Sequence, residues 1–225
     1  MKNVIVTGTG KGIGFETALQ LAAQGVNVLA LSRNIRKEFA ENPLITCLSV
    51  DLGQAESFPV IENFITNSWK KVDAVIHNAG ALILKPFAET STEDFLKVYN
   101  VNVFAVAALN KIVLPYMGAG SHVVTISSIG GIQGSVKFSG LSAYSSSKGA
   151  VITLSELLAE EYREKGIAFN VLALGSVQTE MLAEAFPGYQ APVSAADMAS
   201  YISEFTLNGN KFYNGKVLQV SSTTP

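Results

Sequence analysis

The segment Thr7-Gly8-Thr9-Gly10-Lys11-Gly12-Ile13-Gly14 decides how the chain is expected to fold. It follows an apolar run at residues 4–6 and opens a stretch with helical spacing at residues 13–24. Glycines let the backbone approach a pyrophosphate closely, and the first turn of a helix offers unpaired N–H groups and a partial positive charge. The order of strand, glycine turn and helix therefore predicts a phosphate-binding turn at the start of an α/β domain.

The glycine spacing narrows this interpretation. The dinucleotide fingerprint GxGxxG would need glycine at position 13 or 15, where the chain has Ile13 and Phe15. Gly8, Gly12 and Gly14 instead follow the pattern TGxxxGxG, which resembles the short-chain dehydrogenase/reductase family. The alternative is a glycine turn made only for tight packing.

Composition sets outer limits. The 225 residues are 48% hydrophobic and 15% charged, which suits one domain with a large core. A formal net charge of −2 offers no general basic field, so we expect neither nucleic acid nor a membrane as partner. The single cysteine, Cys47, cannot form an internal disulfide, and we expect no signal segment and no run of transmembrane length. A cytoplasmic protein is the expectation.

Strand-like and helix-like segments alternate along the chain. Apolar runs predict strands at residues 4–6, 26–31, 44–50, 72–76, 121–127, 167–172 and 216–220, and helical spacing predicts helices at 13–24, from about 34, and at 58–69, 90–114, 141–165 and 194–206. This alternation predicts a mostly parallel, doubly wound, Rossmann-type sheet in three α/β/α layers. We expect one NAD(P)-binding domain over residues 1–225, with a cofactor and catalytic core at 1–179, a substrate flap at 180–193, and the last helix and strand at 194–225.

Ligands of such a sheet bind beyond the carboxyl ends of the strands. The residues there are Ser32-Arg33, Asp51-Leu52, Asn78-Ala79-Gly80 and Ser127-Ser128, in the order of the family pattern. The resemblance implies that Asp51 and Leu52 border the adenine, and that Asn78, Ala79 and Gly80 line the cofactor and stabilise the central strands. Taken alone, an Asp or an Asn-Ala-Gly after a strand more often forms a turn or a helix cap. His77 replaces an asparagine often found there in the family.

Tyr144 and Lys148 carry the predicted chemistry. A separation of four residues on a helix puts the phenol and the ammonium on one face. A phenol normally ionises near pH 10, and a neighbouring ammonium favours the phenolate, so Tyr144 can serve as general acid or base. The alternative is an exposed lysine beside a packing tyrosine.

The resemblance adds further catalytic residues. It implies that Ser128 hydrogen-bonds the substrate carbonyl, that Asn102 holds a water in the proton relay, and that Lys148 also binds the nicotinamide ribose. Ser127 and Asn100 are the rival positions. The segment between Ser128 and Tyr144 is longer than usual in the family. His77 and His122 form no metal-ligand pattern, so we expect no metal.

The end of the second predicted strand bears on cofactor choice. An acidic residue there selects NAD, whereas this chain has Ser32 and Arg33, which can bind a 2′-phosphate. Lys11 adds a second positive charge, so NADP is the predicted cofactor, with NAD possible. After the sixth predicted strand, Leu174-Gly175 stands where the family usually has Pro-Gly. The resemblance implies that Thr179 contacts the carboxamide of the cofactor. The cofactor residues are thus Gly8, Lys11, Gly12, Ile13, Gly14, Ser32, Arg33, Asp51, Leu52, Asn78, Ala79, Gly80, Tyr144, Lys148, Gly175 and Thr179.

These expectations define an oxidoreductase that interconverts a carbonyl compound and a secondary alcohol by hydride transfer. The other hypothesis is a nucleotide-binding regulatory or interaction protein that keeps the fold without turnover. An apolar flap predicts a small, uncharged carbonyl or alcohol substrate. The resemblance also implies a homodimer or homotetramer formed through the helices at residues 90–114 and 141–165. Beyond residue 179 the resemblance weakens, and residues 221–225 lack the family's glycine-rich ending.

Overall fold

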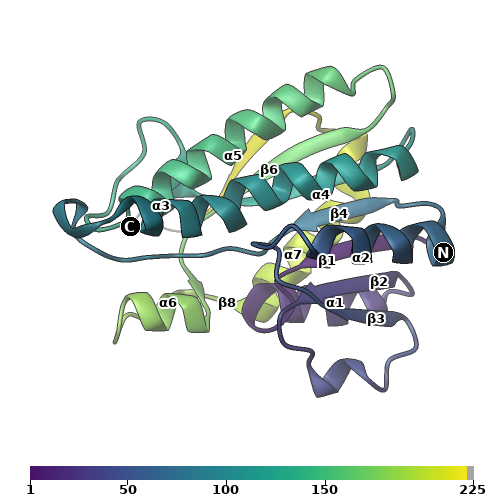
Figure 1. The fold of residues 1–225 in the computed structure, drawn as a ribbon, viewed down its shortest axis with the longest axis horizontal. Helices are drawn as coiled ribbons and strands as arrows, with labels where there is room; N and C mark the ends of the chain where they lie inside the picture. The colour runs from purple at the N-terminus through teal and green to yellow at the C-terminus, as the bar shows by residue number, and fades with distance from the viewer. Residues whose placement is uncertain (222–225) are drawn as a thin grey trace.

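The computed structural model describes residues 1–221, which form a parallel sheet between two layers of helices (Figure 1). The seven strands lie in the order β3-β2-β1-β4-β5-β6-β9. Their bounds are Asn3–Thr7 (β1), Asn27–Ser32 (β2), Ile45–Ser49 (β3), Ala74–His77 (β4), His122–Ser128 (β5), Ala168–Leu174 (β6) and Lys216–Val220 (β9). The predicted doubly wound Rossmann-type fold is confirmed.

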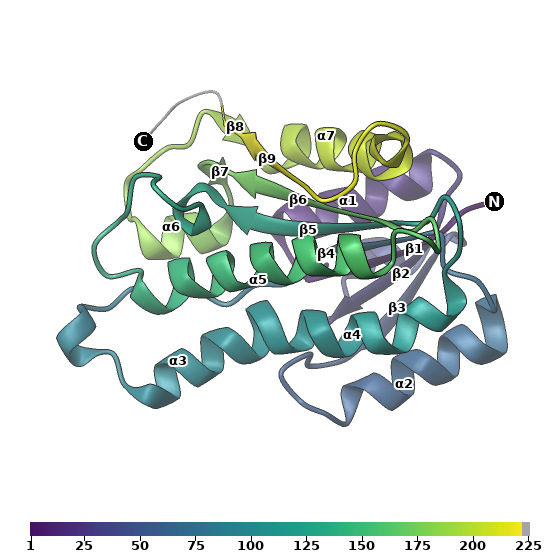
Figure 2. The ribbon, with the colours of Figure 1, turned by 90° about the horizontal axis from the view of Figure 1, so that it is seen from above.

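The strands are apolar on both faces because helices cover both. In β1, Val4 and Val6 pack into the core on one face of the sheet, and Ile5 packs into the core on the opposite face. Figure 2 shows the two helical layers on either side of the sheet. The long helices are Gly12–Ala23 (α1), Ser57–Phe64 (α2), Thr92–Tyr99 (α3), Ala105–Val113 (α4), Ser142–Glu161 (α5) and Ala195–Asn208 (α7).

The order of the strands locates the ligand-binding edge. From β1 the chain moves outward to β2 and β3, and then returns to pair β4 with the other side of β1. The carboxyl ends of β1 and β4 therefore flank the point where the winding reverses. In open α/β sheets this crevice is where ligands bind.

The helical run from Thr92 to Tyr116 is continuous but not uniform. The π-helical turn Asn100–Phe104 (η4) separates α3 from α4, and the 3₁₀ turn Leu114–Tyr116 (η5) ends the run. By length and composition alone this 25-residue run could cross a membrane, so the expectation that no run reaches that length is wrong. An 18-residue window of this run is 44% buried, because the run shares a core with strand residues and contacts α5.

Other differences from the sequence expectation lie in short elements. The polar segment after β2 forms only the 3₁₀ turn Lys37–Phe39 (η1), and α5 ends at Glu161 because its last predicted residues turn toward Gly166, whose φ is 69°. The short strands Val177–Gln178 (β7) and Val193–Ser194 (β8) and the helix Glu180–Ala185 (α6) were not predicted. The remaining turns are Ile65–Trp69 (η2), Phe87–Glu89 (η3), Ile129–Gly131 (η6) and Gly209–Lys211 (η7). The unusual ending noted in the sequence lies, from residue 222 on, outside the described residues.

Candidate active site

The glycine turn between β1 and α1 has little room for side chains. Gly8 and Gly12 adopt left-handed backbone conformations, with φ of 74° and 57°. A Cβ atom on Gly14 would lie 2.4 Å from the Gly8 carbonyl oxygen and 2.4 Å from Nδ2 of Asn78. Ile13 instead packs against the core below the turn. Since α1 begins here with no acidic residue in its first turn, its N-terminal N–H groups can bind an anion.

Asn78 fastens this turn to strand β4. Its Nδ2 donates hydrogen bonds to the carbonyl oxygens of Thr7, at 3.0 Å, and Gly8, at 3.3 Å. The backbone N–H groups of Asn78 and Ala79 both donate to Oγ1 of Thr7, each at 2.9 Å. The Asn78-Ala79-Gly80 turn therefore holds the ends of the two central strands together.

Strand β5 holds Lys148 at both its side chain and its backbone. The Lys148 Nζ donates to the carbonyl oxygen of Ile126 at 2.8 Å, and Oγ of Ser127 donates to the carbonyl oxygen of Lys148 at 2.9 Å. Nζ also lies 5.7 Å from the centre of the Tyr144 ring, so the phenol and the ammonium share one helix face. Lys148 is only 5% exposed, and this burial lowers its pKa to about 8.

Ser128 lies beside the phenol of Tyr144. Burial raises the pKa of Tyr144, and a hydrogen bond with the Ser128 side chain offsets part of that increase. The lowering of the phenol pKa by Lys148 that was expected from the sequence is not found, because burial dominates and the pKa of Tyr144 is raised. Half-buried Ser128 accepts a hydrogen bond from Gly130 N at 3.2 Å, whereas Ser127 is buried and braces Lys148. Of the two candidate serines, the structure brings only Ser128 to the phenol.

Asn102 occupies the π-helical turn between α3 and α4 and is 1% exposed, whereas the rival Asn100 faces solvent. Its Oδ1 accepts a hydrogen bond from Ala81 N at 2.8 Å. Its Nδ2 donates to the carbonyl oxygen of Ala81 at 3.0 Å and to Oγ of Ser147 at 2.9 Å. Both N–H groups of the Asn102 side chain are thus engaged by protein groups, so Asn102 can hold a relay water only as a hydrogen-bond acceptor.

Gly80 lies where these parts meet. A Cβ atom there would be 3.7 Å from Oδ1 of Asn102 and 3.8 Å from Nζ of Lys148. Elements far apart in the sequence, the turn after β4, the π-helical turn and helix α5, therefore converge on one small volume at the edge of the sheet.

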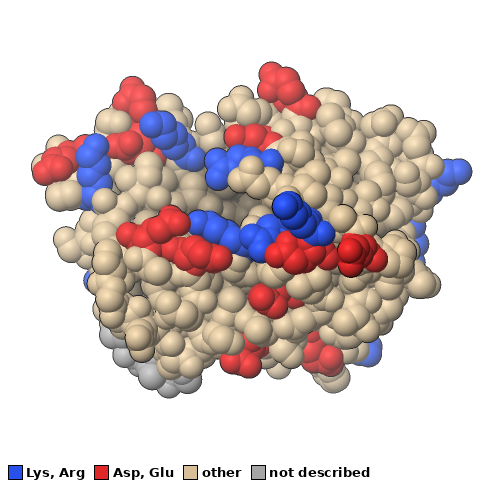
Figure 3. Space-filling view, turned by 90° about the horizontal axis from the view of Figure 1, so that it is seen from below, with Lys and Arg blue, Asp and Glu red and all other residues tan. Residues whose placement is uncertain are grey.

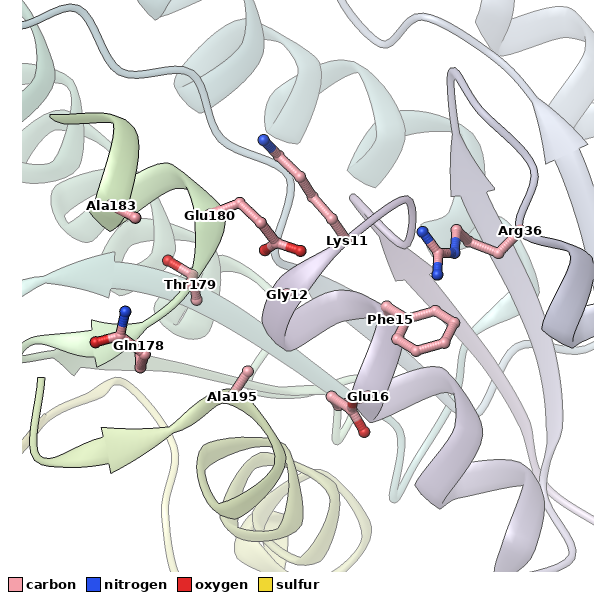
Figure 4. A pocket seen from close by; sticks show the side chains of 10 residues that line it. All are labelled: Lys11, Gly12, Phe15, Glu16, Arg36, Gln178, Thr179, Glu180, Ala183 and Ala195. Atoms are coloured by element: carbon pink, nitrogen blue, oxygen red, sulfur yellow. The ribbon is translucent and has the colours of Figure 1, made fainter. Parts of the chain in front are cut away.

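A cavity of about 430 Å³ lies beside the glycine turn (Figure 4). Helix α6 places the carboxylate of Glu180 in the cavity lining, and the carboxylate of Glu184, four residues later, pairs with the lining residue Lys11. Oε1 of Glu184 is 2.9 Å from Nζ of Lys11, and Oε2 of Glu180 is 3.3 Å from where a Cβ on Gly12 would lie. The cavity is lined by Lys11, Gly12, Phe15, Glu16, Arg36, Gln178, Thr179, Glu180, Ala183 and Ala195.

The residues expected at the adenosine lie at the ends of β2 and β3. Oγ of Ser32 donates to the carbonyl oxygen of Asn34 at 2.7 Å, and Arg33 is exposed. Oδ1 of Asp51 accepts from the N–H of Gly53, which closes a tight turn, and Leu52 is buried. Figure 3, which views the molecule from below, shows lysine and arginine side chains beside acidic ones around a hollow.

Arg36, which the sequence did not single out, lines the cavity in place of Arg33. Its guanidinium carbon lies 4.8 Å from the centre of the Phe15 ring, and the group also pairs with Glu38. The hydrogen bond from Arg36 lowers the pKa of the Glu38 carboxyl.

Thr179 and Gly175 serve different contacts. Cγ2 of Thr179 would touch a Cβ on Gly12 at 3.3 Å, and its hydroxyl caps α6 by accepting from Leu182 N at 3.2 Å. A Cβ on Gly175 would instead lie 2.4 Å from Oγ of Ser221. Thr179 therefore lies against the glycine turn, and Gly175 allows the end of β9 to pack closely.

Both histidines are buried, and each makes hydrogen bonds to side chains or backbone outside the predicted catalytic set. Nε2 of His77 lies 2.9 Å from Oδ1 of Asn110, and the ring of His122 contacts the Thr206 carbonyl and the Asn170 amide. Burial lowers the pKa of each imidazole to about 4. Within residues 1–221 no group of three or more histidine, cysteine or acidic side chains could hold a metal.

Two contacts at the site, Ser147 with Asn102 and Glu184 with Lys11, could not be predicted from the motif spacing. Ser147 lies inside the Tyr144–Lys148 motif, but its partner Asn102 comes from a different helix, so the sequence gives no sign of their contact. Glu180 and Glu184 have the i, i+4 spacing of one helix face, yet α6 is too short for its periodicity to be recognised.

The chain matches the family described as "short chain dehydrogenase" over residues 2–190 and belongs to it. It is therefore an oxidoreductase of the nicotinamide-dependent kind, as the sequence predicted.

L-xylulose reductase of Mesocricetus auratus is 34% identical over 187 residues, which cover 80% of this chain and 73% of that protein. Carbonyl reductase (NADPH) 2 of Sus scrofa is 33% identical over 183 residues, covering 79% and 72%. The solved structure of ElxO with NADP bound is 30% identical, covers 97% of this chain and 96% of its own, and superposes with a TM-score of 0.84.

Proposed function

We propose that this protein is an NADP-dependent oxidoreductase that interconverts a carbonyl compound and a secondary alcohol, with Tyr144 as general acid and base. The observation that carries the proposal is the grouping of Tyr144, Ser128 and buried Lys148 at the carboxyl edge of the sheet. The names of the two reductase relatives agree with it.

In the proposed chemistry, Tyr144 transfers the proton. When bound, the nicotinamide cofactor supplies or accepts the hydride. In reduction, the Tyr144 hydroxyl gives its proton to the carbonyl oxygen, while the Ser128 hydroxyl hydrogen-bonds the same oxygen. The resulting phenolate lies near the Lys148 ammonium, which stabilises it. In oxidation, the phenolate removes the proton from the alcohol. Because both side-chain N–H groups of Asn102 are engaged, Asn102 would serve the relay as a hydrogen-bond acceptor.

The residues present suit a dinucleotide. The bare backbone at Gly8, Gly12 and Gly14, with the start of α1, would hold the diphosphate. Arg33 and Lys11 would bind the 2′-phosphate that distinguishes NADP from NAD. The remaining assignments follow the family: Lys148 for the ribose, Asp51 and Leu52 for the adenine, and Thr179 for the carboxamide.

The substrate is proposed to be a small or medium, uncharged carbonyl compound. The flap at residues 180–193 carries Met181, Leu182 and Phe186, and the loop after Ser128 adds Val136 and Phe138, which are 45% and 36% exposed. A panel of ketones and aldehydes, followed by the absorbance of the cofactor, tests this. A strong preference for charged acyl substrates would contradict it.

We further propose a homodimer or homotetramer built on the helices α3 to α5. Leu96, Phe104 and Leu157 are 50%, 52% and 63% exposed, and these helices lie side by side in Figure 2. Light scattering should give a multiple of the 23.9 kDa chain, and a monomer at working concentration would contradict the proposal. The cytoplasmic location stays a prediction from sequence.

Tyr144→Phe tests the central assignment. It removes the transferable proton, so turnover should fall by about 10²–10⁴-fold while NADPH still binds. Tyr162→Phe, near the end of the same helix, is the matched control and should keep full turnover. Unchanged turnover in Tyr144→Phe would remove Tyr144 from the chemistry. A wild-type protein that binds NADPH but turns over no carbonyl compound would favour the regulatory alternative.

A further inference from the structure

Ser147 is a buried hydroxyl between the two residues of the catalytic motif. Ser147 is 0% exposed. It lies on α5 within one helical turn of both Tyr144 and Lys148. Oγ donates a hydrogen bond to the carbonyl oxygen of Tyr144 at 2.7 Å and accepts one from Nδ2 of Asn102 at 2.9 Å. A single hydroxyl thus joins the catalytic helix to the π-helical turn.

The partner of Ser147 has no N–H donor to spare. A side-chain amide has two N–H donors, and Asn102 uses one for the Ala81 carbonyl and the other for Ser147. Ala81 directly follows the Asn78-Ala79-Gly80 turn. An unbroken chain of hydrogen bonds therefore runs from that turn through Asn102 and Ser147 to the backbone of Tyr144.

A bond from a serine to a carbonyl three residues earlier is common in helices, and Ser146 provides the comparison. Its Oγ donates to the carbonyl oxygen of Ala143 at 3.2 Å, but its side chain is exposed. The two neighbouring serines share the local bond and differ in burial and in the contact with Asn102. What Ser147 adds is the contact between helices.

We propose that Ser147 is a positioning residue for the reaction, which fixes the Tyr144 turn of α5 against Asn102. The inference rests on the proposed role of Tyr144. Without the hydroxyl, one N–H of Asn102 loses its partner in a buried site, and the π-helical turn and the Tyr144 turn can shift relative to each other. A phenol displaced by a fraction of an ångström transfers its proton less efficiently, although the cofactor site is intact.

The experiment compares Ser147→Ala with Ser146→Ala. For Ser147→Ala we expect kcat to fall roughly ten- to a hundredfold, with the KM for the carbonyl substrate and the Kd for NADPH little changed. Its Tm should fall by about 2–4 °C. Ser146→Ala should match the wild type in all four measurements. A loss confined to Tm, with kcat unchanged, would show a merely structural role and overturn the proposal.

A double-mutant cycle with Asn102→Ala tests the route of the effect. If Ser147 acts through Asn102, adding Ser147→Ala to Asn102→Ala should lower kcat little further. Losses that multiply would overturn the route. If Asn102→Ala does not fold, the comparison of the two serine variants still decides. Tyr144→Phe separates the two levels: if it keeps turnover, the proposed function fails, and if it loses turnover while Ser147→Ala does not, only this inference fails.

Discussion

The two halves of the ligand-binding edge hold their polar groups in different ways. In the catalytic half, formed by β4, β5, α4 and α5, Asn102, Ser147 and Lys148 are at most 5% exposed, and each has a hydrogen-bonding partner. In the adenosine half, around β1 and β2, Arg33 is exposed and Lys11 pairs with Glu184 on the surface. One half buries neutral and charged groups, and the other displays charges to water.

The difference reflects what each half has to do. Proton transfer needs atoms fixed within fractions of an ångström, and buried groups with complete hydrogen bonds provide that rigidity. Selecting a phosphate needs charge within reach, and exposed ion pairs are individually weak and easily exchanged. Substitutions in the buried half should therefore cause large losses of stability or turnover. Substitutions in the exposed half should cause smaller changes in the affinity for NADPH relative to NADH.

Acidification should lower the stability of the fold most. The two buried histidines, His77 in β4 and His122 in β5, are held uncharged in the folded state and would have to bind protons. The pKa of each is about 4 when folded and about 6.5 when unfolded, so the unfolded state binds more protons below pH 6.5. The free energy of unfolding should therefore fall as pH decreases from 6.5 towards 4, by about 2 kcal/mol per histidine at pH 5.

Urea unfolding at pH 7.5, 6 and 5 measures this dependence. Carboxyl groups whose pKa is lowered, such as those of Asp94 and Glu38, start from ordinary values near 4, so the interval from pH 6.5 to 5 reports mainly on the histidines. A free energy of unfolding that stays constant over this interval would contradict the assigned burial.

Gly14→Ala should disrupt the close packing between the glycine turn and Asn78, where the two halves meet. The new Cβ would lie 2.4 Å from both the Gly8 oxygen and Asn78 Nδ2, so the backbone of the turn must move. We expect a loss of stability of about 3 kcal/mol and roughly a hundredfold weaker NADPH binding. Gly10→Ala is the matched control, because its Cβ has no neighbour closer than 3.6 Å. Equal effects of the two changes in thermal melts and NADPH titrations would count against close packing as the reason for Gly14.

The same contrast explains which features the sequence predicts. The strands, the glycine turn and the side-by-side placement of Tyr144 and Lys148 follow from local periodicity, because each is set by neighbours in the chain. Ser147–Asn102 and Lys11–Glu184 join residues 45 and 173 positions apart, and no local pattern encodes such contacts. The position of Arg36 in the cavity likewise depends on the path of the loop after β2, which forms only a short 3₁₀ turn where a helix was expected.

Arg33→Ala sharpens the contrast at the adenosine half. Loss of a charge-assisted phosphate contact costs on the order of 1.5–3 kcal/mol, so NADPH should bind roughly ten- to a hundredfold more weakly. NADH binding should be nearly unchanged, since NADH lacks the 2′-phosphate. Titrations of both cofactors measure this, with Arg36→Ala as the comparison. A larger loss of NADPH binding in Arg36→Ala would transfer the phosphate contact to Arg36, and equal losses for both cofactors would remove Arg33 from the discrimination.

Glu184→Gln should produce the smallest change, and in the opposite direction. Lys11 and Glu184 form an ion pair at 2.9 Å with side chains 50% and 70% exposed. A 2′-phosphate that binds Lys11 must compete with this carboxylate and is also repelled by it. Because exposed pairs contribute little, the neutral variant should bind NADPH only about two- to fivefold more tightly.

Three controls isolate that small gain. NADH should gain less than NADPH, because it brings no second phosphate to Lys11. The gain should shrink at high salt, because the Debye length falls from about 10 Å at 0.1 M to about 3 Å at 1 M and the charges are then screened from one another. Glu156→Gln, an exposed change of the same net charge on α5, should leave both affinities unaltered. If Glu184→Gln weakens NADPH binding instead, the carboxylate holds Lys11 in its binding position, and the ion pair assists the phosphate site where it was expected to compete with it.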